Sequence, residues 1–214
     1  GVGDETDVVS KEMYSFKDKG NRDITLRPEG TAGVVRAYLE AGLHKSDPFV
    51  KWYYNGPMYR YEAPQKGRYR EFHQIGPEIF GVRNPYIDAE IIKMGCEFLD
   101  KLGISGLTVE INSLGNISSR KKYIQDLKEF LKNRLDKLSD DSKKRYEKNP
   151  LRILDSKDIK DQEQLINAPK LYDYLDEESK NYFENTKKYL DIENIHDAIF
   201  SNINYIKNIL VSSK

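Results

Sequence analysis

The chain has 214 residues, of which 38% are hydrophobic and 33% charged, and its formal net charge is zero. This length allows one large domain or a domain with an insertion, and the neutral balance gives no electrostatic argument for nucleic-acid or membrane binding. A single cysteine excludes a disulfide framework, and we expect a reducing, cytoplasmic location. No run of eighteen apolar residues occurs, so we expect no membrane span. The first residues lack both a methionine and the apolar segment of a signal peptide, so the chain is expected to begin inside a longer protein.

The first half of the chain predicts a mixture of short strands and helices. Residues 24–26 form a strand candidate, and Thr31 is placed to cap a helix that ends near Gly42. Residues 49–54 (FVKWYY) have strong β propensity, which the turn-forming residues 55–57 (NGP) are expected to interrupt. The pattern is typical of an α+β domain.

A second helix is predicted after Pro85, and Gly103 is expected to end it. The apolar stripe of this helix is expected to consist of Ile87, Ile91, Phe98 and Leu102. Residues 107–111 then alternate between apolar and polar side chains, as expected of a strand with one buried face.

Beyond Asn116 the composition changes, because all 14 glycines lie at or before residue 115. Apolar residues recur at helical spacing, and residues 117–190 predict a separate helical domain. Residues 117–150 hold 11 Lys and Arg against 6 Asp and Glu, whereas residues 171–200 hold 3 against 8. This split fits either an RNA-facing side or ordinary solvated helix faces, and the second is the simpler interpretation.

Residues 59–78 (YRYEAPQKGRYREFHQIGPE) predict a β-hairpin with its tip between residues 63 and 67. Side chains of a strand alternate between the two faces of a sheet, so the even-numbered residues of one strand share a face. That face would carry charged, amide, aromatic and glycine positions, namely Arg60, Glu62, Arg68, Arg70, Phe72, Gln74, Gly76 and Glu78. A short tip allows both strands to present these positions on the same side.

Two interpretations of this even-numbered face are open. Alternating charges are normal on a solvated sheet face, whereas guanidinium groups suit phosphate oxygens and the Phe72 ring suits stacking on a base. Gly76 is expected to leave a hole where a ligand approaches the backbone, and Gln74 and Glu78 could give specificity deeper along the strand. His73 has the opposite parity and is expected to be a packed core histidine. Neither a GxxxxGK(S/T) nor an HExxH motif occurs, so the implied chemistry is positioning and charge neutralisation.

The stretches TLRPEGTAGVVRAY (25–38) and GPMYRYEAPQKGRYREFHQIGPEIFG (56–81) resemble the histidyl-tRNA synthetase family. The second is similar to motif 2 of the class II aminoacyl-tRNA synthetases in its histidine-specific form. The resemblance implies part of a class II antiparallel sheet with flanking helices over residues 1–116, a small all-helical insertion domain over 117–190, and a return segment over 191–214. It also implies a ligase that uses ATP and Mg²⁺ to convert L-histidine to histidyl-adenylate and then charges tRNA(His). The full-length protein would be a homodimer.

The resemblance implies ATP-binding roles for four residues of the hairpin. Arg60 would be the catalytic arginine, because it would hold the α-phosphate of ATP and neutralise the charge that develops there. Glu62 and Arg68 would flank the adenine and the outer phosphates, and Phe72 would stack on the adenine. The resemblance names no metal ligand in this chain.

Deeper on the same face, the resemblance implies a site for the amino acid. Glu29, Thr31 and Gln74 would bind the α-amino group of histidine. Glu78 would accept a hydrogen bond from the imidazole ring and so select the side chain. Gln65, at the hairpin tip, would approach the acceptor end of the tRNA.

Several parts of the family pattern are absent from the chain. These are motifs 1 and 3, the stretch resembling RGLDYYT, and the anticodon-binding domain, so we interpret the chain as a fragment that is inactive alone. An alternative is the non-catalytic, histidine-sensing regulatory subunit of ATP phosphoribosyltransferase. Such a sensor does not need the nucleotide-binding set and is expected to lack the helical insertion. A structural or RNA-binding module built on residues 117–190 is a third interpretation.

Overall fold

The computed structural model describes residues 12–62, 66–104, 106–193, 195, 198–199 and 210–213. The chain divides into two compact units, residues 1–83 and 84–214. In the described part of the chain, no helix is long and apolar enough to cross a membrane.

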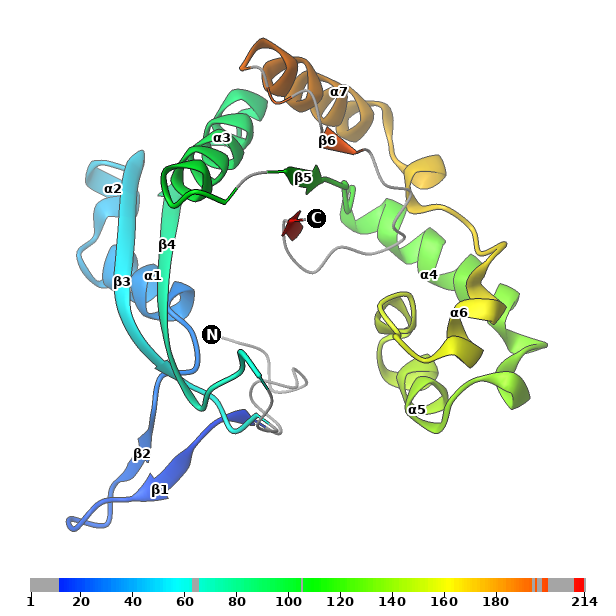
Figure 1. Cartoon of the computed structure of the whole chain (residues 1–214), viewed down its shortest axis with the longest axis horizontal. Coiled ribbons are helices and arrows are strands. Elements are labelled where there is room, and N and C mark those ends of the chain that lie inside the picture. Colours follow the sequence, from blue (N-terminus) through cyan, green and yellow to red (C-terminus); the bar gives the residue numbers. More distant parts are fainter. Residues whose placement is uncertain are drawn as a thin grey trace. The chain divides into compact units, whose positions relative to one another are not determined.

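The first unit combines two antiparallel strand pairs with two helices (Figure 1). Its elements are β1 (Ser15–Lys17), β2 (Asp23–Thr25), α1 (Thr31–Glu40), α2 (Leu43–Ser46), β3 (Val50–Tyr59) and β4 (Glu71–Phe80). The strands β3 and β4 pair over ten residues each, from Val50 opposite Phe80 to Tyr59 opposite Glu71. The predicted hairpin is therefore confirmed.

Strand β3 runs without a break through residues 55–57, so the predicted interruption there is wrong. Pairing with β4 along the whole strand outweighs the local turn preference of Asn-Gly-Pro. The register places Gly56 opposite Gln74 and Tyr54 opposite Gly76. Even-numbered residues of the two strands therefore share one face, as the sequence predicts.

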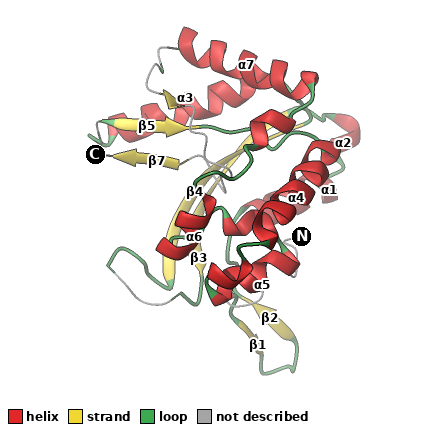
Figure 2. Cartoon of the chain, turned by 90° about the vertical axis from the view of Figure 1, so that its right-hand side faces the viewer, coloured by secondary structure: helices red, strands yellow, loops and turns green. Residues whose placement is uncertain are grey.

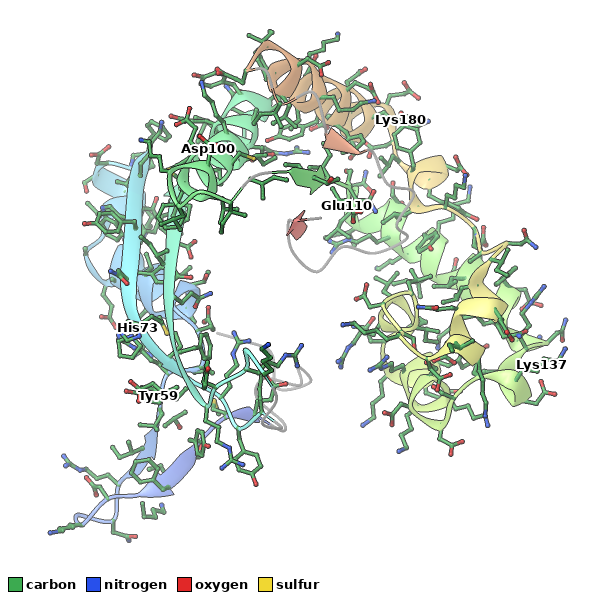
Figure 3. The ribbon with its side chains drawn as sticks, in the orientation of Figure 1. Tyr59, His73, Asp100, Glu110, Lys137 and Lys180 are labelled. Atoms are coloured by element: carbon green, nitrogen blue, oxygen red, sulfur yellow. The ribbon has the colours of Figure 1, made fainter. Side chains whose placement is uncertain are left out.

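Helix α1 packs on this even-numbered face. The ring of Tyr38 stacks on that of Phe80 with the centroids 4.6 Å apart. It also makes a T-shaped contact with the Trp52 ring, where the centroids are 6.3 Å apart. The opposite face is open among the described residues, where Tyr53 is 76% exposed. His73 lies on that face and is exposed, so the prediction of a packed core histidine is wrong (Figure 3). The cause is that α1 covers the other side of the hairpin.

The start of α1 also differs from the prediction. Thr31 is the first helical residue, and Gly30 occupies the cap position without a side-chain hydrogen bond. The carboxylate of Glu29 instead accepts the free backbone N–H of Ala32 at 2.8 Å. This contact satisfies one of the donors that every helix start leaves open and frees the Thr31 hydroxyl for another partner. Gly42 follows the helix with a φ of 69°, as predicted.

The second unit is built mainly from helices (Figure 2). Its elements are α3 (Pro85–Lys101), β5 (Leu107–Glu110), α4 (Ile117–Lys132), η2 (Leu135–Lys137), α5 (Asp140–Lys148), η3 (Pro150–Ile153), α6 (Ile159–Leu165), η4 (Leu171–Tyr174), α7 (Glu177–Ile192), β6 (Ala198–Ile199) and β7 (Leu210–Ser213). Strand β5 pairs in parallel with β6 and antiparallel with β7.

This unit contains two apolar cores. One belongs to the helical region and is formed by Tyr123, Leu127, Leu131, Leu138, Leu151, Ile153, Ala168 and Leu171. The other joins α3, β5 and α7 through Ala89, Ile92, Val109, Ile111, Phe183 and Leu190. Helix α7 therefore shares a core with α3 and β5. The domain limits at residues 117 and 190 stay a prediction.

Helix α3 has its predicted limits but buries a different stripe. Its buried residues are Ala89 and Ile92, whereas Phe98 and Leu102 are 45% and 61% exposed. The helix has two apolar stripes, and α7 with β5 covers the one that contains Ala89. The prediction is wrong at Phe98 and Leu102 for this reason.

Candidate ligand site on the hairpin

The site residues predicted nearest the hairpin tip form one cluster. The Arg60 Nε donates to the backbone oxygen of Pro28 at 2.8 Å, and its guanidinium lies 5.2 Å from the centre of the Phe72 ring. The Glu62 carboxylate lies 4.0 Å from Arg60 Nη1 and 3.5 Å from Arg68 Nη1. The structure therefore brings the four predicted ATP-binding residues together.

The Arg60 guanidinium is held in place through its Nε, while its terminal nitrogens are only weakly paired. Its Nε donates to the backbone oxygen of Pro28, whereas its terminal nitrogen Nη1 lies 4.0 Å from Glu62, which makes a weak ion pair. The side chain of Arg60 is 25% exposed, and that of Arg68 is 56% exposed. Such a planar, oriented donor pair suits phosphate oxygens, whose negative charge would compete with the carboxylate of Glu62.

A second cluster lies further along the hairpin and contains two carboxylates. The Thr31 hydroxyl donates to Glu78 Oε1 at 2.6 Å, and the carboxylate of Glu29 approaches from the start of α1. Burial raises the pKa of the Tyr54 phenol on the same face, and the charges of Glu78 and Glu29 raise it further. The hydrogen bond with Thr31 and the charge of Arg60 oppose this rise. The cluster is acidic and fits a cationic group.

Gln74 lies on the same face, directly opposite Gly56. Its Oε1 is buried and has no hydrogen-bond partner among the described residues. Buried polar atoms of proteins are nearly always paired, so this oxygen needs a donor from elsewhere. The structure thus places the predicted residues Glu29, Thr31, Gln74 and Glu78 on one face. Gln65 lies outside the described residues.

The expected hole above Gly76 is filled, so that prediction is wrong. A Cβ at Gly76 would lie 2.5 Å from the Tyr54 hydroxyl oxygen, and a Cβ at Gly30 would lie 2.3 Å from the Tyr54 ring. The two glycines make room for a protein side chain and not for a ligand. Even parity is the one signal of Tyr54 in the sequence, because its place opposite Gly76 depends on the register of β3 with β4.

Arg27 is a second residue of this face that the sequence did not indicate. Its Nε donates to the backbone oxygen of Pro57 at 2.7 Å, and its Nη2 would lie 2.7 Å from a Cβ at Gly56. Arg27 and Arg60 therefore each anchor one guanidinium nitrogen on a backbone oxygen. No pattern in the residues around Arg27 predicts this geometry, because the geometry depends on the pairing of β3 with the loop before α1.

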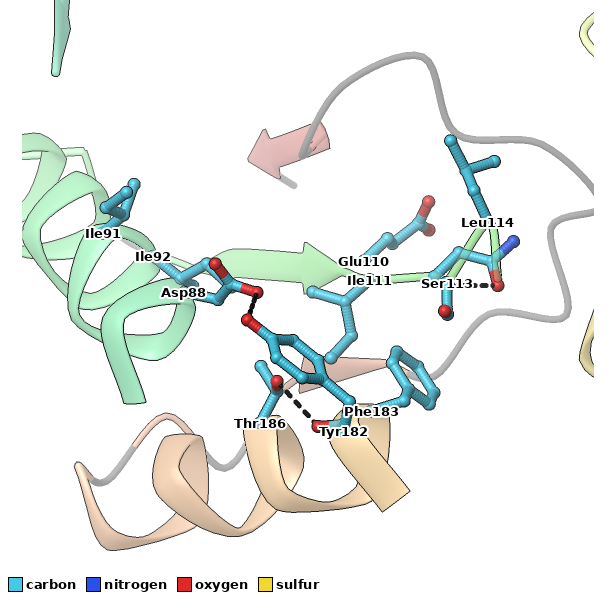
Figure 4. A pocket seen from close by; sticks show the side chains of 11 residues that line it. Asp88, Ile91, Ile92, Glu110, Ile111, Ser113, Leu114, Tyr182, Phe183 and Thr186 are labelled. Carbon is cyan, nitrogen blue, oxygen red and sulfur yellow. Dashed lines mark hydrogen bonds between the residues drawn. The ribbon is translucent and has the colours of Figure 1, made fainter. Parts of the chain in front are cut away.

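A separate pocket of about 450 Å³ lies in the second unit, among α3, β5 and α7 (Figure 4). Its walls are mainly apolar, with Ile92, Ile111 and Phe183 among them, and the Tyr182 hydroxyl donates to Asp88 across it at 3.0 Å. None of the site residues predicted from the sequence lines this pocket. The chemistry of the hairpin face is therefore independent of it.

The described residues hold no group of three or more His, Cys, Asp or Glu side chains that could bind a metal ion. A magnesium ion commonly keeps several waters and binds through one or two carboxylates together with substrate phosphates. Glu62 is the carboxylate that pairs with both Arg60 and Arg68, and a single carboxylate suits an ion that arrives with a nucleotide better than a cage made only of protein ligands.

The chain is similar to known proteins along most of its length. The family model for histidyl-tRNA synthetase matches residues 3–119. The histidine–tRNA ligases of Limosilactobacillus fermentum and Geobacter metallireducens are 56% and 52% identical to the chain over 193 and 190 residues. Both alignments cover 89% of the chain, but they cover only 44% and 46% of the relatives. The chain thus spans less than half the length of these relatives.

Two solved structures extend the comparison. The crystal structure of apo Staphylococcus aureus histidyl-tRNA synthetase matches with a TM-score of 0.69 and 38% identity, over 94% of this chain and 46% of that chain. An ATP phosphoribosyltransferase regulatory subunit/histidyl-tRNA synthetase from Bacillus halodurans matches with a TM-score of 0.55 and 19% identity, over 88% of this chain and 52% of that chain. The second likeness concerns the fold alone.

The α+β fold with its antiparallel hairpin is that of part of a class II aminoacyl-tRNA synthetase catalytic domain. The match of the family model over more than half of the chain is more specific. The chain belongs to the histidyl-tRNA synthetase family.

Proposed function

We propose that this chain carries the histidine-binding and ATP-binding face of an enzyme that activates L-histidine and transfers it to tRNA(His). The carboxylate of histidine would attack the α-phosphorus of ATP, and pyrophosphate would leave. Histidyl-adenylate formed in this way would then react with the terminal ribose of the tRNA. Because the chain spans less than half of its relatives, we expect it to be inactive alone.

The observation that carries this proposal is the buried, unpartnered Oε1 of Gln74. Leaving such an atom without a donor costs roughly 1–3 kcal/mol, so a ligand that donates to it gains this energy on binding. The α-ammonium group of histidine is a suitable donor. Glu29 and Thr31 on the same face would accept and orient the remaining ammonium protons.

Glu78 supplies the proposed selection of the imidazole ring. One of its oxygens accepts from Thr31, which leaves the second oxygen able to accept from a ring N–H. A site built to pair with a substrate N–H rejects analogues that lack it, because its own polar group would then stay buried and unpaired. Glu78 is therefore the proposed specificity residue.

At the tip end of the face, Arg60 is the proposed catalytic residue. Its guanidinium, oriented by Pro28 and Phe72, would neutralise the charge that builds on the α-phosphate in the transition state. Arg68 is more exposed and would bind the outer phosphates, where Mg²⁺ would neutralise further charge when it is bound. The free face of the Phe72 ring would stack on adenine, because Arg60 covers the other face.

The remaining proposals concern the larger protein. Residues 117–190 would form an insertion domain beside the catalytic domain, and Gln65 would meet the acceptor end of the tRNA. A homodimer and a cytoplasmic location are proposed from the family. The retained nucleotide set of Arg60, Glu62 and Arg68 favours the ligase over a histidine sensor.

Calorimetric titration with a non-hydrolysable histidyl-adenylate analogue tests the proposal. Gln74→Ala removes the unpartnered oxygen and is expected to weaken binding roughly fivefold to tenfold, the value of one lost hydrogen bond. The matched control is His73→Ala, because His73 is the neighbouring residue and lies on the opposite, exposed face. This variant should bind the analogue as tightly as the unchanged chain does. Equal binding by the Gln74→Ala variant would refute the proposed role. Pyrophosphate exchange above background by the chain alone would refute the expectation that it is inactive.

A further inference from the structure

The side chain of Arg27 is anchored on the hairpin in the same way as that of Arg60. Its Nε donates to the backbone oxygen of Pro57 at 2.7 Å, and its own backbone oxygen accepts the N–H of Tyr59 at 2.9 Å. A guanidinium is planar and rigid, so a hydrogen bond from Nε restricts the direction of its two terminal nitrogens. Arg27 therefore presents an oriented pair of donors to the even-numbered face.

The terminal nitrogen Nη2 of Arg27 lies over Gly56. A Cβ at Gly56 would be 2.7 Å from this nitrogen and 3.6 Å from Arg27 Cζ, so the missing side chain makes room for the guanidinium. Gly56 lies directly opposite Gln74 in the register of β3 with β4. Directly opposite residues of an antiparallel pair have their Cβ positions about 5 Å apart, so the guanidinium lies beside the Gln74 side chain. Arg27 thus reaches the part of the face assigned to the amino acid.

The charge of Arg27 has no ion-pair partner among the described residues. The guanidinium groups of Arg60 and Arg68 face the carboxylate of Glu62 at 4.0 and 3.5 Å, whereas no described carboxylate lies within 4 Å of that of Arg27. The nearby Oε1 of Gln74 has no hydrogen-bond partner in the described part of the chain, so Arg27 does not donate to it. An oriented cation in this state suits an anionic group of a ligand.

The acidic character of the amino-acid end makes a cation necessary there. The carboxylates of Glu29 and Glu78 suit the ammonium group of histidine, but a free amino acid also brings a carboxylate of its own. Like charges repel strongly at short distance where water is scarce, so this carboxylate would be driven away unless a positive group lay beside it. The guanidinium of Arg27 can offset this repulsion.

We propose that Arg27 is a substrate-binding residue that holds the carboxylate of the free amino acid. This inference rests on the proposed function, since it concerns the same site. Arg27 lies at the level of Gln74, whereas Arg60 lies over Phe72, the next residue of β4 on this face toward the hairpin tip. A carboxylate on Arg27 would have its own ammonium group at Gln74 on one side and the α-phosphate at Arg60 on the other. This order matches that of the ammonium, acyl and phosphate groups in histidyl-adenylate.

Calorimetric titration of the full chain with L-histidine and with L-histidinol tests the inference, because histidinol carries a hydroxymethyl group in place of the carboxylate. We expect the unchanged chain to bind histidine about tenfold more tightly than histidinol, the value of a hydrogen bond to a charged group. Arg27→Met should lose this factor for histidine and leave the affinity for histidinol unchanged. The matched control is Arg22→Met, which removes an exposed arginine of the same unit and should change neither affinity.

The comparison of the two ligands separates substrate binding from a merely structural role. If Arg27 only holds the loop before α1 on Pro57, Arg27→Met should weaken both ligands equally, and this result would overturn the inference. Gly56→Ala is a second variant, because its Cβ displaces Nη2 of Arg27 without removing the arginine. It should lower the preference for histidine over histidinol in the same direction. A preference that survives in both variants would also overturn the inference.

L-Proline distinguishes a failure of this inference from a failure of the proposed function, because it carries the ammonium and carboxylate groups without the imidazole. A chain that binds proline as tightly as histidine, and binds both more weakly after Arg27→Met, would refute the proposed function and leave the role of Arg27 standing. A chain that prefers histidine over proline but binds histidinol as tightly as histidine would overturn the role of Arg27 and leave the proposed function standing.

Discussion

The buried carboxylate of Asp161 joins several parts of the helical region, and its loss should be costly. Asp161 is fully buried and accepts hydrogen bonds from the backbone N–H of Ser139 at 2.8 Å and from three hydroxyls. These hydroxyls belong to Ser139 at 2.8 Å, Ser142 at 2.6 Å and Ser156 at 2.5 Å. The carboxylate thereby joins α6 to the start of α5 and to the loop before α6.

The expected magnitude follows from which donors water can reach. Ser142 is fully buried, so the loss of its bond to a charged group costs about 2 kcal/mol, and the backbone N–H of Ser139 adds about 1 kcal/mol. Ser139 and Ser156 are only half-buried residues, so we expect their hydroxyls to turn toward water. Asp161→Ala should therefore destabilise the helical region by about 3 kcal/mol. For a chain of this size, that corresponds to a fall in Tm of roughly 6–12 °C.

Thermal unfolding followed by circular dichroism measures this effect. Glu163→Ala, an exposed change in the same helix, is the matched control and should stay within about 0.5 kcal/mol of the unchanged chain. Asp161→Asn keeps one acceptor oxygen and should lose about half as much stability as Asp161→Ala. An Asp161→Ala variant as stable as the Glu163→Ala control would refute the reasoning.

The same site predicts a pH dependence. Burial raises the pKa of Asp161, but the hydrogen bonds from Ser142, Ser156 and Ser139 outweigh it, and the pKa falls below its ordinary value of 3.8. The folded state therefore prefers the ionised form, and this preference stabilises the protein above about pH 4. As the pH falls from there through the lowered pKa, the stability difference between the unchanged chain and Asp161→Asn should shrink. A difference that is constant between pH 7 and pH 2 would contradict the lowered pKa.

Two further predictions concern the packing of each unit. Gly81→Ala should destabilise the first unit by more than about 1 kcal/mol, because φ at Gly81 is +81° and a Cβ there would lie 1.9 Å from the Pro48 oxygen. The control is Gly33→Ala in α1, where a Cβ would meet nothing within 4 Å, so this variant should be as stable as the unchanged chain or more stable. Equal melting temperatures of the two variants would contradict this. Tyr182→Phe removes the hydrogen bond from α7 to Asp88 on α3 and should lower the free energy of unfolding in urea by about 1 kcal/mol. An unchanged urea midpoint would show that water replaces the bond.

The alternation of residues along the hairpin could be predicted from the sequence, because it depends only on strand geometry. Even-numbered residues of β3 and β4 share a face, and the four residues assigned to ATP binding lie together on it. Which face is covered could not be predicted, since that depends on where α1 packs. The parity of His73 therefore predicts a core position, whereas the residue is exposed.

Long-range contacts also explain the other differences. The strand break expected at residues 55–57 is overridden by ten residues of pairing with β4. The role of Tyr54 was missed because glycines distant in sequence create its position, Gly30 before α1 and Gly76 on β4. Helix α3 offers two apolar stripes, and the choice between them depends on α7, which begins more than seventy residues later. Local sequence patterns contain none of these pairings.

The most direct test of the central claim compares two ligands on one chain by calorimetry. The unchanged chain and Glu78→Gln are each titrated with non-hydrolysable histidyl-adenylate and prolyl-adenylate analogues. We predict that the unchanged chain prefers the histidyl analogue and that Glu78→Gln removes this preference, because the ring N–H then loses its charged acceptor. Equal binding of the two analogues by the unchanged chain would contradict the account, as would a preference that survives the loss of the Glu78 carboxylate.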